Sequence, residues 1–258
     1  MTRPSRFSLP RAFLCAATVA ALGCNVLGGD STDGDLGVAR FEYSSGCFLD
    51  CKGVTRAMVA GTEESISAQL KGGQEPYAES ANPAVFRVTA TKNTRTCCTR
   101  SGSSSTCSEG ESSDSCRARG GELSVRSNID VVAVGPGEAK LRLMGANRAL
   151  VDSVTLKVEV PATLDVDVAQ GATGVPRLDL RVGEAVVLSP HARSADGSPL
   201  QATKGFVLRV DDTLVVGFRD TGLTLSSPRW SLQARAAGAT TMHIVSGGLD
   251  VGIPVTVR

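Results

Sequence analysis

Apolar and polar side chains alternate strictly along residues 153–160. Val154, Leu156, Val158 and Val160 occupy one set of positions, and the other set is Ser153, Thr155, Lys157 and Glu159. A period of two over eight residues is typical of a β-strand with one buried face and one wet face. Shorter copies of the pattern recur along the chain, and turn residues separate them. Because no stretch keeps a helical period over a dozen residues, the sequence predicts an all-β body.

The two halves of this body can be aligned with each other. Gly137, Leu141 and Leu143 fall over Gly238, Met242 and Ile244 without a gap. With two fewer residues in the next hairpin of the second half, Val154, Leu156 and Val158 fall over Ile253, Val255 and Val257. Upstream, Gly61 matches Gly183, and each comes just before a strand. Two units with roughly seven short strands each predict tandem β-sandwiches over residues 38–160 and 161–258.

The second half resembles a known family. The stretches that carry the resemblance are Leu180-Arg-Val-Gly-Glu-Ala-Val-Val-Leu188, Asp196-Gly-Ser-Pro-Leu200, residues 232–240 and Ile253-Pro-Val-Thr-Val257. Together they resemble the group 2 bacterial immunoglobulin-like domains of invasin-type adhesins and many lipoproteins, although Leu208 stands where those domains often have tryptophan. The first half matches only in its closing strands. The resemblance implies immunoglobulin-like sandwiches that act as spacers, stalks or binding modules and not as enzymes.

The N-terminus has the layout of an export signal. Arg3, Arg6 and Arg11 precede the uncharged residues 12–23, a run that is too short to span a bilayer. Its end, Ala21-Leu22-Gly23-Cys24, resembles the lipobox of bacterial lipoproteins, in which the cysteine is lipidated, although Ala21 stands where leucine is usual. Residues 1–23 are therefore predicted to be a lipoprotein signal peptide. Ordinary secretion after a plain signal peptidase is the alternative.

Cysteine parity supports lipidation of Cys24. Cleavage before Cys24 removes Cys15, and a lipid on Cys24 leaves an even set: Cys47, Cys51, Cys97, Cys98, Cys107 and Cys116. An even set suits disulfides in an oxidising compartment. The sequence thus predicts a palmitate-bearing anchor at Cys24. Asn25 favours the outer membrane under the family's sorting rule, and a secreted or periplasmic protein is the alternative.

A linker precedes the body. Residues 25–37 are rich in glycine and aspartate and have no periodic pattern. Residues 24–37 are therefore predicted to be the lipid anchor and a flexible tether. The spacing of Asp30, Asp33 and Asp35 lacks the full ligand pattern of a calcium loop.

Residues 92–121 interrupt the first sandwich. This insertion is rich in serine and holds four cysteines. Pairings that close the shortest loops are favoured, which predicts a Cys47–Cys51 bond and pairing of the other four cysteines within the insertion. The alternative is a bond from Cys47 or Cys51 to Cys97 or Cys98. Zinc is the weaker interpretation because paired C-x2-C elements are missing. A cross-linked protrusion could be a binding surface, or a tolerated insertion, since it contains no aromatic anchor.

Nothing in the sequence indicates catalysis or a cofactor. The charge is nearly balanced, with a formal net charge of +1, so nucleic acid is not an expected partner. Nucleophile, zinc-protease, phosphate-loop and dinucleotide motifs are all missing. His191 is predicted to lie at the end of a strand, and His243 to be a solvent-facing strand residue. Asp211-Asp212 is predicted to be a turn, and Trp230 a core or sheet-face residue.

The predicted function follows from the signal, the repeat and the insertion. We expect a non-catalytic, membrane-anchored envelope lipoprotein that acts as a structural or interaction module. The alternative is an adhesin or ligand-binding protein that uses the disulfide-bonded loop 92–121. The predicted partners are the lipid bilayer, through Cys24, and an envelope protein or polysaccharide.

Overall fold

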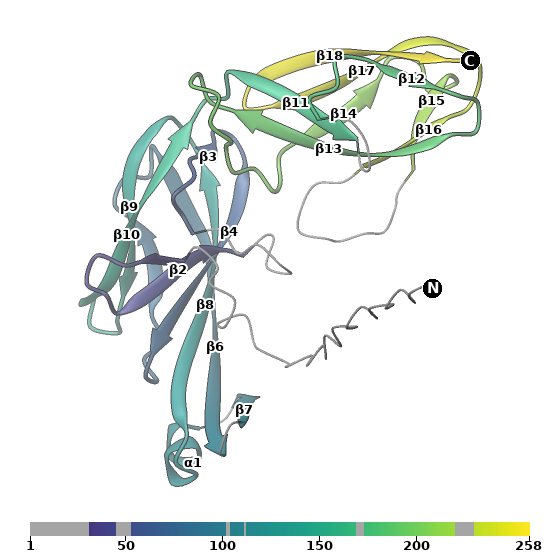
Figure 1. Ribbon diagram of the computed structural model, residues 1–258. Coiled ribbons are helices and arrows are strands. Elements are labelled where there is room, and N and C mark those ends of the chain that lie inside the picture. The colour runs from purple at the N-terminus through teal and green to yellow at the C-terminus, as the bar shows by residue number, and fades with distance from the viewer. Residues whose placement is uncertain (1–30, 45–52, 102–103, 111, 169–172, 220–229) are drawn as a thin grey trace, which may run out of the picture.

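The computed structural model describes residues 31–44, 53–101, 104–110, 112–168, 173–219 and 230–258 (Figure 1). Strands make up nearly all of the regular structure in these ranges, and the helix among them is α1 (Ser113–Ala118), which has six residues. The predicted all-β fold is confirmed.

The first unit consists of two sheets around one apolar core. The larger sheet has the order β1 (Thr32–Asp33), β2 (Ala39–Tyr43), β4 (Glu63–Lys71), β8 (Glu122–Ala133), β6 (Phe86–Ser101), β7 (Ser104–Glu109). The smaller sheet has the order β3 (Met58–Val59), β10 (Leu150–Glu159), β9 (Gly137–Met144), β5 (Tyr77–Ser80). The alternating apolar residues of β10 face inward, where Leu156 is fully buried between the sheets.

The second unit has two four-stranded sheets around a second core. One has the order β11 (Thr163–Val168), β13 (Ala185–Arg193), β16 (Trp230–Ala234), β15 (Val216–Arg219). The other has the order β12 (Leu178–Leu180), β18 (Leu249–Val257), β17 (Gly238–Ser246), β14 (Val207–Val210). Trp230 is half-buried and packs against this core, as predicted.

The two units repeat one strand arrangement. The order β2-β4-β8-β6 reappears as β11-β13-β16-β15, and β3-β10-β9-β5 reappears as β12-β18-β17-β14, including the parallel pairs β3–β10 and β12–β18. Gly61 and Gly183 both have positive φ, +82° and +86°, and their amides bind the carbonyls of Ala133 and Ala234. This is the face-to-face packing of an immunoglobulin-like sandwich, and it confirms the predicted alignment of the halves.

Direct contacts join the units. The amide of Val59 donates to the carbonyl of Gln201 at 3.0 Å, and the amide of Gln201 donates to the carbonyl of Ala57 at 2.8 Å. Ala57 and Val59 belong to the first unit, yet both side chains lie in the core of the second. The carboxylate of Glu64, 1% exposed, accepts hydrogen bonds from Thr203 and Gln201. The joint between the two units therefore consists of backbone hydrogen bonds beside a buried, hydrogen-bonded carboxylate.

The predicted flexible tether over residues 24–37 is wrong for its second half. β1 pairs with β2, and the buried carboxylate of Asp152 accepts the amides of Leu36 at 2.9 Å, Val38 at 2.8 Å and Ala39 at 2.7 Å. A buried carboxylate needs such donors, and these backbone amides supply them. Residues 31–37 are thus part of the first unit. The preceding residues, including the predicted signal peptide 1–23 and Cys24, lie outside the described part of the chain.

Candidate functional site

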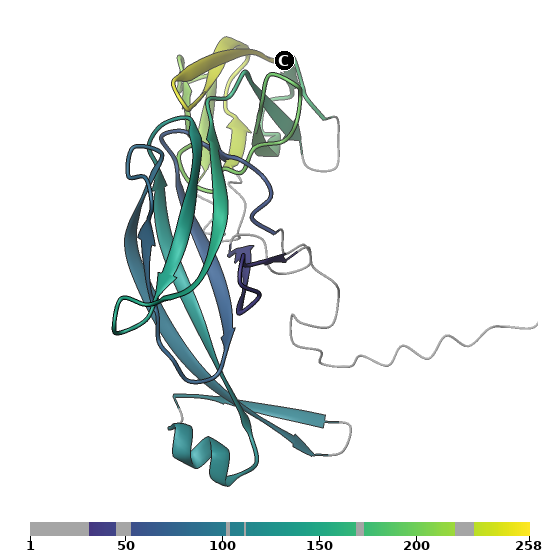
Figure 2. The ribbon, with the colours of Figure 1, turned by 90° about the vertical axis from the view of Figure 1, so that its left-hand side faces the viewer.

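The predicted protrusion, residues 92–121, is an arm built on extended strands. β6 continues without a break to Ser101, and its partner β8 begins at Glu122, so the prediction of a loop that interrupts the sheet is wrong. Figure 2 shows both strands running past the sandwich to β7 and α1, at the end of the first unit away from the second. Within the arm, β6 pairs with β8 up to Cys98 and with β7 from Thr96 to Ser101, so its backbone is hydrogen-bonded along the whole length. The apolar alternation is missing here because most of these residues do not face the core.

A disulfide between Cys97 and Cys116 fastens α1 to β6. Both residues are 1% exposed, and their Cα atoms are 5.6 Å apart. The Oγ of Ser112 caps the helix by accepting the amide of Ser115 at 3.2 Å. A Cβ atom on Gly121 would lie 2.7 Å from the Cys97 Sγ and 2.9 Å from the Cys116 Sγ. Glycine at 121 therefore leaves space for the bond.

Of the other predicted disulfide cysteines, Cys98 and Cys107 lie in the arm. Cys98 is also disulfide-bonded, and its backbone pairs with that of Cys107 across the β6–β7 hairpin. Cys47 and Cys51, which short closure predicts to pair, lie outside the described residues, as does the predicted lipidation residue Cys24. The structure therefore joins Cys97 to Cys116 within the arm.

The base of the arm is braced by the segment that leads into β5. The amide side chain of Asn93 donates to the carbonyl of Pro76 at 2.9 Å, and Arg95 pairs with Glu75 at 2.7 Å. The amide of Ala78 donates to the Thr91 hydroxyl at 3.2 Å. These contacts fix the direction in which the arm leaves the sandwich.

A hollow of about 550 Å³ lies on the outer face of the larger sheet, beside the base of the arm. Its polar lining contains both signs of charge: Asp33, Arg40, Gln69, Lys71, Glu122 and Ser124. Arg40 pairs with Asp33 at 3.2 Å within this lining. A hollow with such a mixed lining does not select a cation or an anion.

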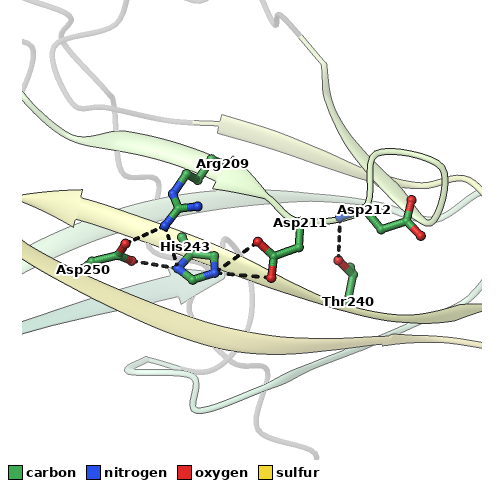
Figure 3. A network of polar contacts seen from close by, with 6 residues as sticks. All are labelled: Arg209, Asp211, Asp212, Thr240, His243 and Asp250. Atoms are coloured by element: carbon green, nitrogen blue, oxygen red, sulfur yellow. Dashed lines mark hydrogen bonds and ion pairs between the residues drawn. The ribbon is translucent and has the colours of Figure 1, made fainter.

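His243 lies in a polar network on the second unit that sequence reasoning missed (Figure 3). Its Nδ1 is 2.7 Å from Asp250 and its Nε2 is 3.3 Å from Asp211, while Arg209 donates to Asp250 at 2.6 Å. Hydrogen bonds from His243 and then Arg209 lower the pKa of the Asp250 carboxyl. His243 lies on the outer face of β17, opposite the buried Met242 and Ile244, as predicted, although its partners leave only 21% of its side chain exposed.

The other polar residues considered from the sequence are dispersed. His191 pairs with Asp167 at 3.0 Å on the neighbouring strand. Asp196 instead accepts hydrogen bonds from the Ser194 hydroxyl and the Ser198 amide, which lower its pKa to about 2. Asp211 and Asp212 lie at the predicted turn after β14. In the ranges that the structure describes, no three potential ligands gather into a metal site, and no helix is long and apolar enough to cross a bilayer.

Comparisons with known proteins return structures only. No family model and no curated protein matches the chain. Domains 4 and 5 of the S-layer protein SbsC match at 19% identity and a TM-score of 0.30, over 70% of this chain and 75% of that one. The Escherichia coli adhesin FdeC matches at 11% identity and a TM-score of 0.31, over 88% and 65%. An intimin fragment, solved with the intimin-binding domain of its receptor Tir, matches at 14% identity and a TM-score of 0.27, over 79% and 62%.

This chain therefore spans less than two thirds of the FdeC and intimin chains. The three structures are similar to it in fold, and the immunoglobulin-like assignment rests on the strand order and register given above.

Proposed function

We propose that the protein is a non-catalytic envelope lipoprotein, anchored through Cys24, that binds an envelope partner with its arm. In this proposal residues 1–23 are the signal peptide, residues 24–30 are the anchor and tether, and the sandwiches span residues 31–160 and 161–258. The proposed tether is thus shorter than the one that the sequence alone predicts.

The construction of the arm is the observation that carries the proposal. The Cys97–Cys116 bond closes a loop whose ends are 19 residues apart, and the base is braced by Asn93 and Arg95. A protrusion held in this way loses little conformational entropy on binding, which favours affinity. An insertion that is merely tolerated needs no such bracing of its base.

Removing the arm tests its role. Replacing residues 96–124 by Asn-Gly joins Arg95 to its cross-strand partner Val125 through a two-residue turn and removes four cysteines together. The full chain and this variant are compared by chemical cross-linking in intact cells, with circular dichroism to verify the sandwiches. We expect the cross-linked envelope adduct to disappear while the β spectrum stays. If both proteins give the same adduct, the arm does not bind the partner, and the protein is a structural module.

Anchoring is tested separately. Cys24→Ala should move the protein from the membrane fraction to the soluble fraction, because the lipid attachment site is lost. Cys15→Ala is the matched control, since this cysteine lies in the segment that cleavage discards. A Cys24→Ala protein that stays with the membranes would contradict the anchor.

A further inference from the structure

An exposed apolar row crosses the outer face of the smaller sheet of the first unit. Met144 on β9 pairs with Tyr77 on β5 and with Leu150 on β10, so the three side chains lie side by side on adjacent strands. Tyr77 is 40% exposed and Leu150 is 46% exposed. Apolar side chains gathered on a wet sheet face indicate a contact surface. We call these three residues the apolar row.

The charged side chains near the apolar row are paired with opposite charges, with one exception. On the next row along the sheet, Arg142 lies 3.8 Å from Glu79, so both charges are paired. Arg148 lies at the tip of the β9–β10 hairpin with a φ of +57°, in the left-handed region that non-glycine residues seldom adopt. It is exposed, and in the described ranges no carboxylate pairs with it. The row therefore ends in an unpaired positive charge.

The chain segment that follows Cys24 enters the first unit at β1, on the edge of the larger sheet, and then contacts the smaller sheet. The amide of Asp35 donates to the carbonyl of Ser153 on β10 at 2.7 Å, and its carboxylate pairs with Lys140 on β9 at 2.6 Å. Leu36, the next residue, is 58% exposed. Six residues, 25–30, separate the anchor position Cys24 from Ser31, and the seven steps between the two reach about 24 Å when fully extended. The smaller sheet, with four strands, is about 15 Å wide. Because the extended segment is longer than this width, the sheet can lie on the bilayer while Cys24 is anchored in it.

We propose that the apolar row and Arg148 form a membrane-contact surface, which holds the first sandwich against an anionic bilayer. This inference rests on the proposed lipid anchor. Tyrosine, leucine and methionine suit the interface between headgroups and acyl chains, and Arg148 meets a lipid phosphate.

The short tether favours lipid as the occupant over a protein partner. Three side chains bury too little area for a stable protein complex, which needs about 800 Å² on each partner. The same weak surface becomes effective when an anchor keeps it at millimolar effective concentration beside the membrane. With the smaller sheet on the bilayer, the first sandwich lies along the surface and does not stand upright on it.

The mature chain with Cys24→Ser tests the surface without the anchor. Its partitioning is measured onto vesicles of phosphatidylethanolamine and phosphatidylglycerol, and compared with the further variants Tyr77→Ser/Leu150→Ser and Arg148→Glu. We expect weak binding that falls roughly tenfold in each variant. Thr155→Ser is the matched control, because Thr155 is exposed on the same strand and face, and its binding should not change.

A second measurement uses the lipidated protein. A fluorescent, environment-sensitive amino acid at position 150 should shift to the blue on native membranes, and the same probe at position 128, exposed on β8 of the larger sheet, should not. The proposed membrane-contact surface would be refuted by equal spectra at the two positions, together with vesicle binding that the three substitutions leave unchanged. A photo-cross-linker at position 150 that captures a protein and no lipid would also overturn it. None of these results depends on Cys24 fractionation, so failure of the anchor and failure of the surface are distinguishable.

Discussion

The carboxylate of Glu64 accepts a hydrogen bond from the hydroxyl of Thr203, with 2.6 Å between the two oxygens, across the joint between the two sandwiches. The other Glu64 oxygen accepts the amide of the same threonine. Glu64 is 1% exposed, and the backbone pairing of Val59 with Gln201 lies beside it. One buried side chain of the first unit thus binds both hydrogen-bond donors of a single residue in the second.

Glu64→Gln should loosen this joint. One carboxylate oxygen becomes an NH2 group that faces a donor, so a buried hydrogen bond is lost at a cost of about 2 kcal/mol. We expect faster hydrogen exchange at the amides of Gln201 and Thr203, and a broader distribution of distances between labels on the two units. Glu63→Gln is the matched control because Glu63 is the exposed neighbour on β4. Unchanged protection at Thr203 would mean that the strand pairing alone holds the joint.

Asp152→Asn should release the N-terminal segment. The two oxygens of Asp152 accept four backbone amides, those of Leu36, Val38, Ala39 and Ser153. An asparagine can accept on one side only, and its NH2 group would oppose donors, so we expect a loss of about 3 kcal/mol from the local stability. Proteolysis within residues 31–39 measures the effect. Asp179→Asn, at a half-exposed position, should leave the cleavage rate unchanged.

Replacing both Cys97 and Cys116 by serine should free α1. Closing a loop of about 20 residues contributes about 3 kcal/mol in the chain-entropy model, and the two buried sulfurs would become hydroxyl groups. Hydrogen exchange should rise across residues 112–121, while Ile129 on the same sheet stays protected within the core. Protection of α1 that survives the double substitution would show that packing alone positions the helix.

The second bond of the arm can be mapped chemically. Cys98 is disulfide-bonded and faces Cys107 in the backbone register, which predicts a Cys98–Cys107 bond. Proteolysis without reduction, followed by mass spectrometry, should give a cross-linked pair of peptides that contain these two residues. A peptide that joins Cys98 to Cys47 or Cys51 would support the rival pairing.

Acid should weaken the contact of Asp35 with β9 and β10. The Lys140 ammonium and then the Ser153 hydroxyl lower the pKa of the Asp35 carboxyl below its ordinary value of 3.8. A lowered pKa in the folded state means that the contact stabilises fully above pH 3.8 and loses its contribution as the pH falls through the folded value. Backbone amide shifts of residues 34–36, followed by NMR from neutral pH downward, should report this loss. Asp35→Asn should remove the pH dependence.

The strands and the repeat could be predicted from the sequence because they have local signals. Val154, Leu156 and Val158 alternate wherever one face packs on the core, and Gly61 and Gly183 mark turns that need positive φ. Residues 92–101 lack this alternation because that part of β6 pairs without covering the core. A polar strand and a polar loop are therefore alike in sequence.

The contacts that position the candidate sites could not be predicted in the same way. Asp152 binds residues that lie more than a hundred positions away, and Glu64 binds Thr203 across two units. Tyr77, Met144 and Leu150 become one row only through the register of three strands. No local pattern encodes such partners, so a single sequence leaves them open.

The placement of Asp152 has a mechanical consequence. If Cys24 is fixed in a membrane and the arm holds a partner, any pull between them enters the chain at two places. One is the segment that Asp152 holds, and the other is the pair β6 and β8. Both places belong to the first sandwich, so tension crosses that sandwich alone. The second sandwich and the Glu64 joint therefore lie outside the path of the load.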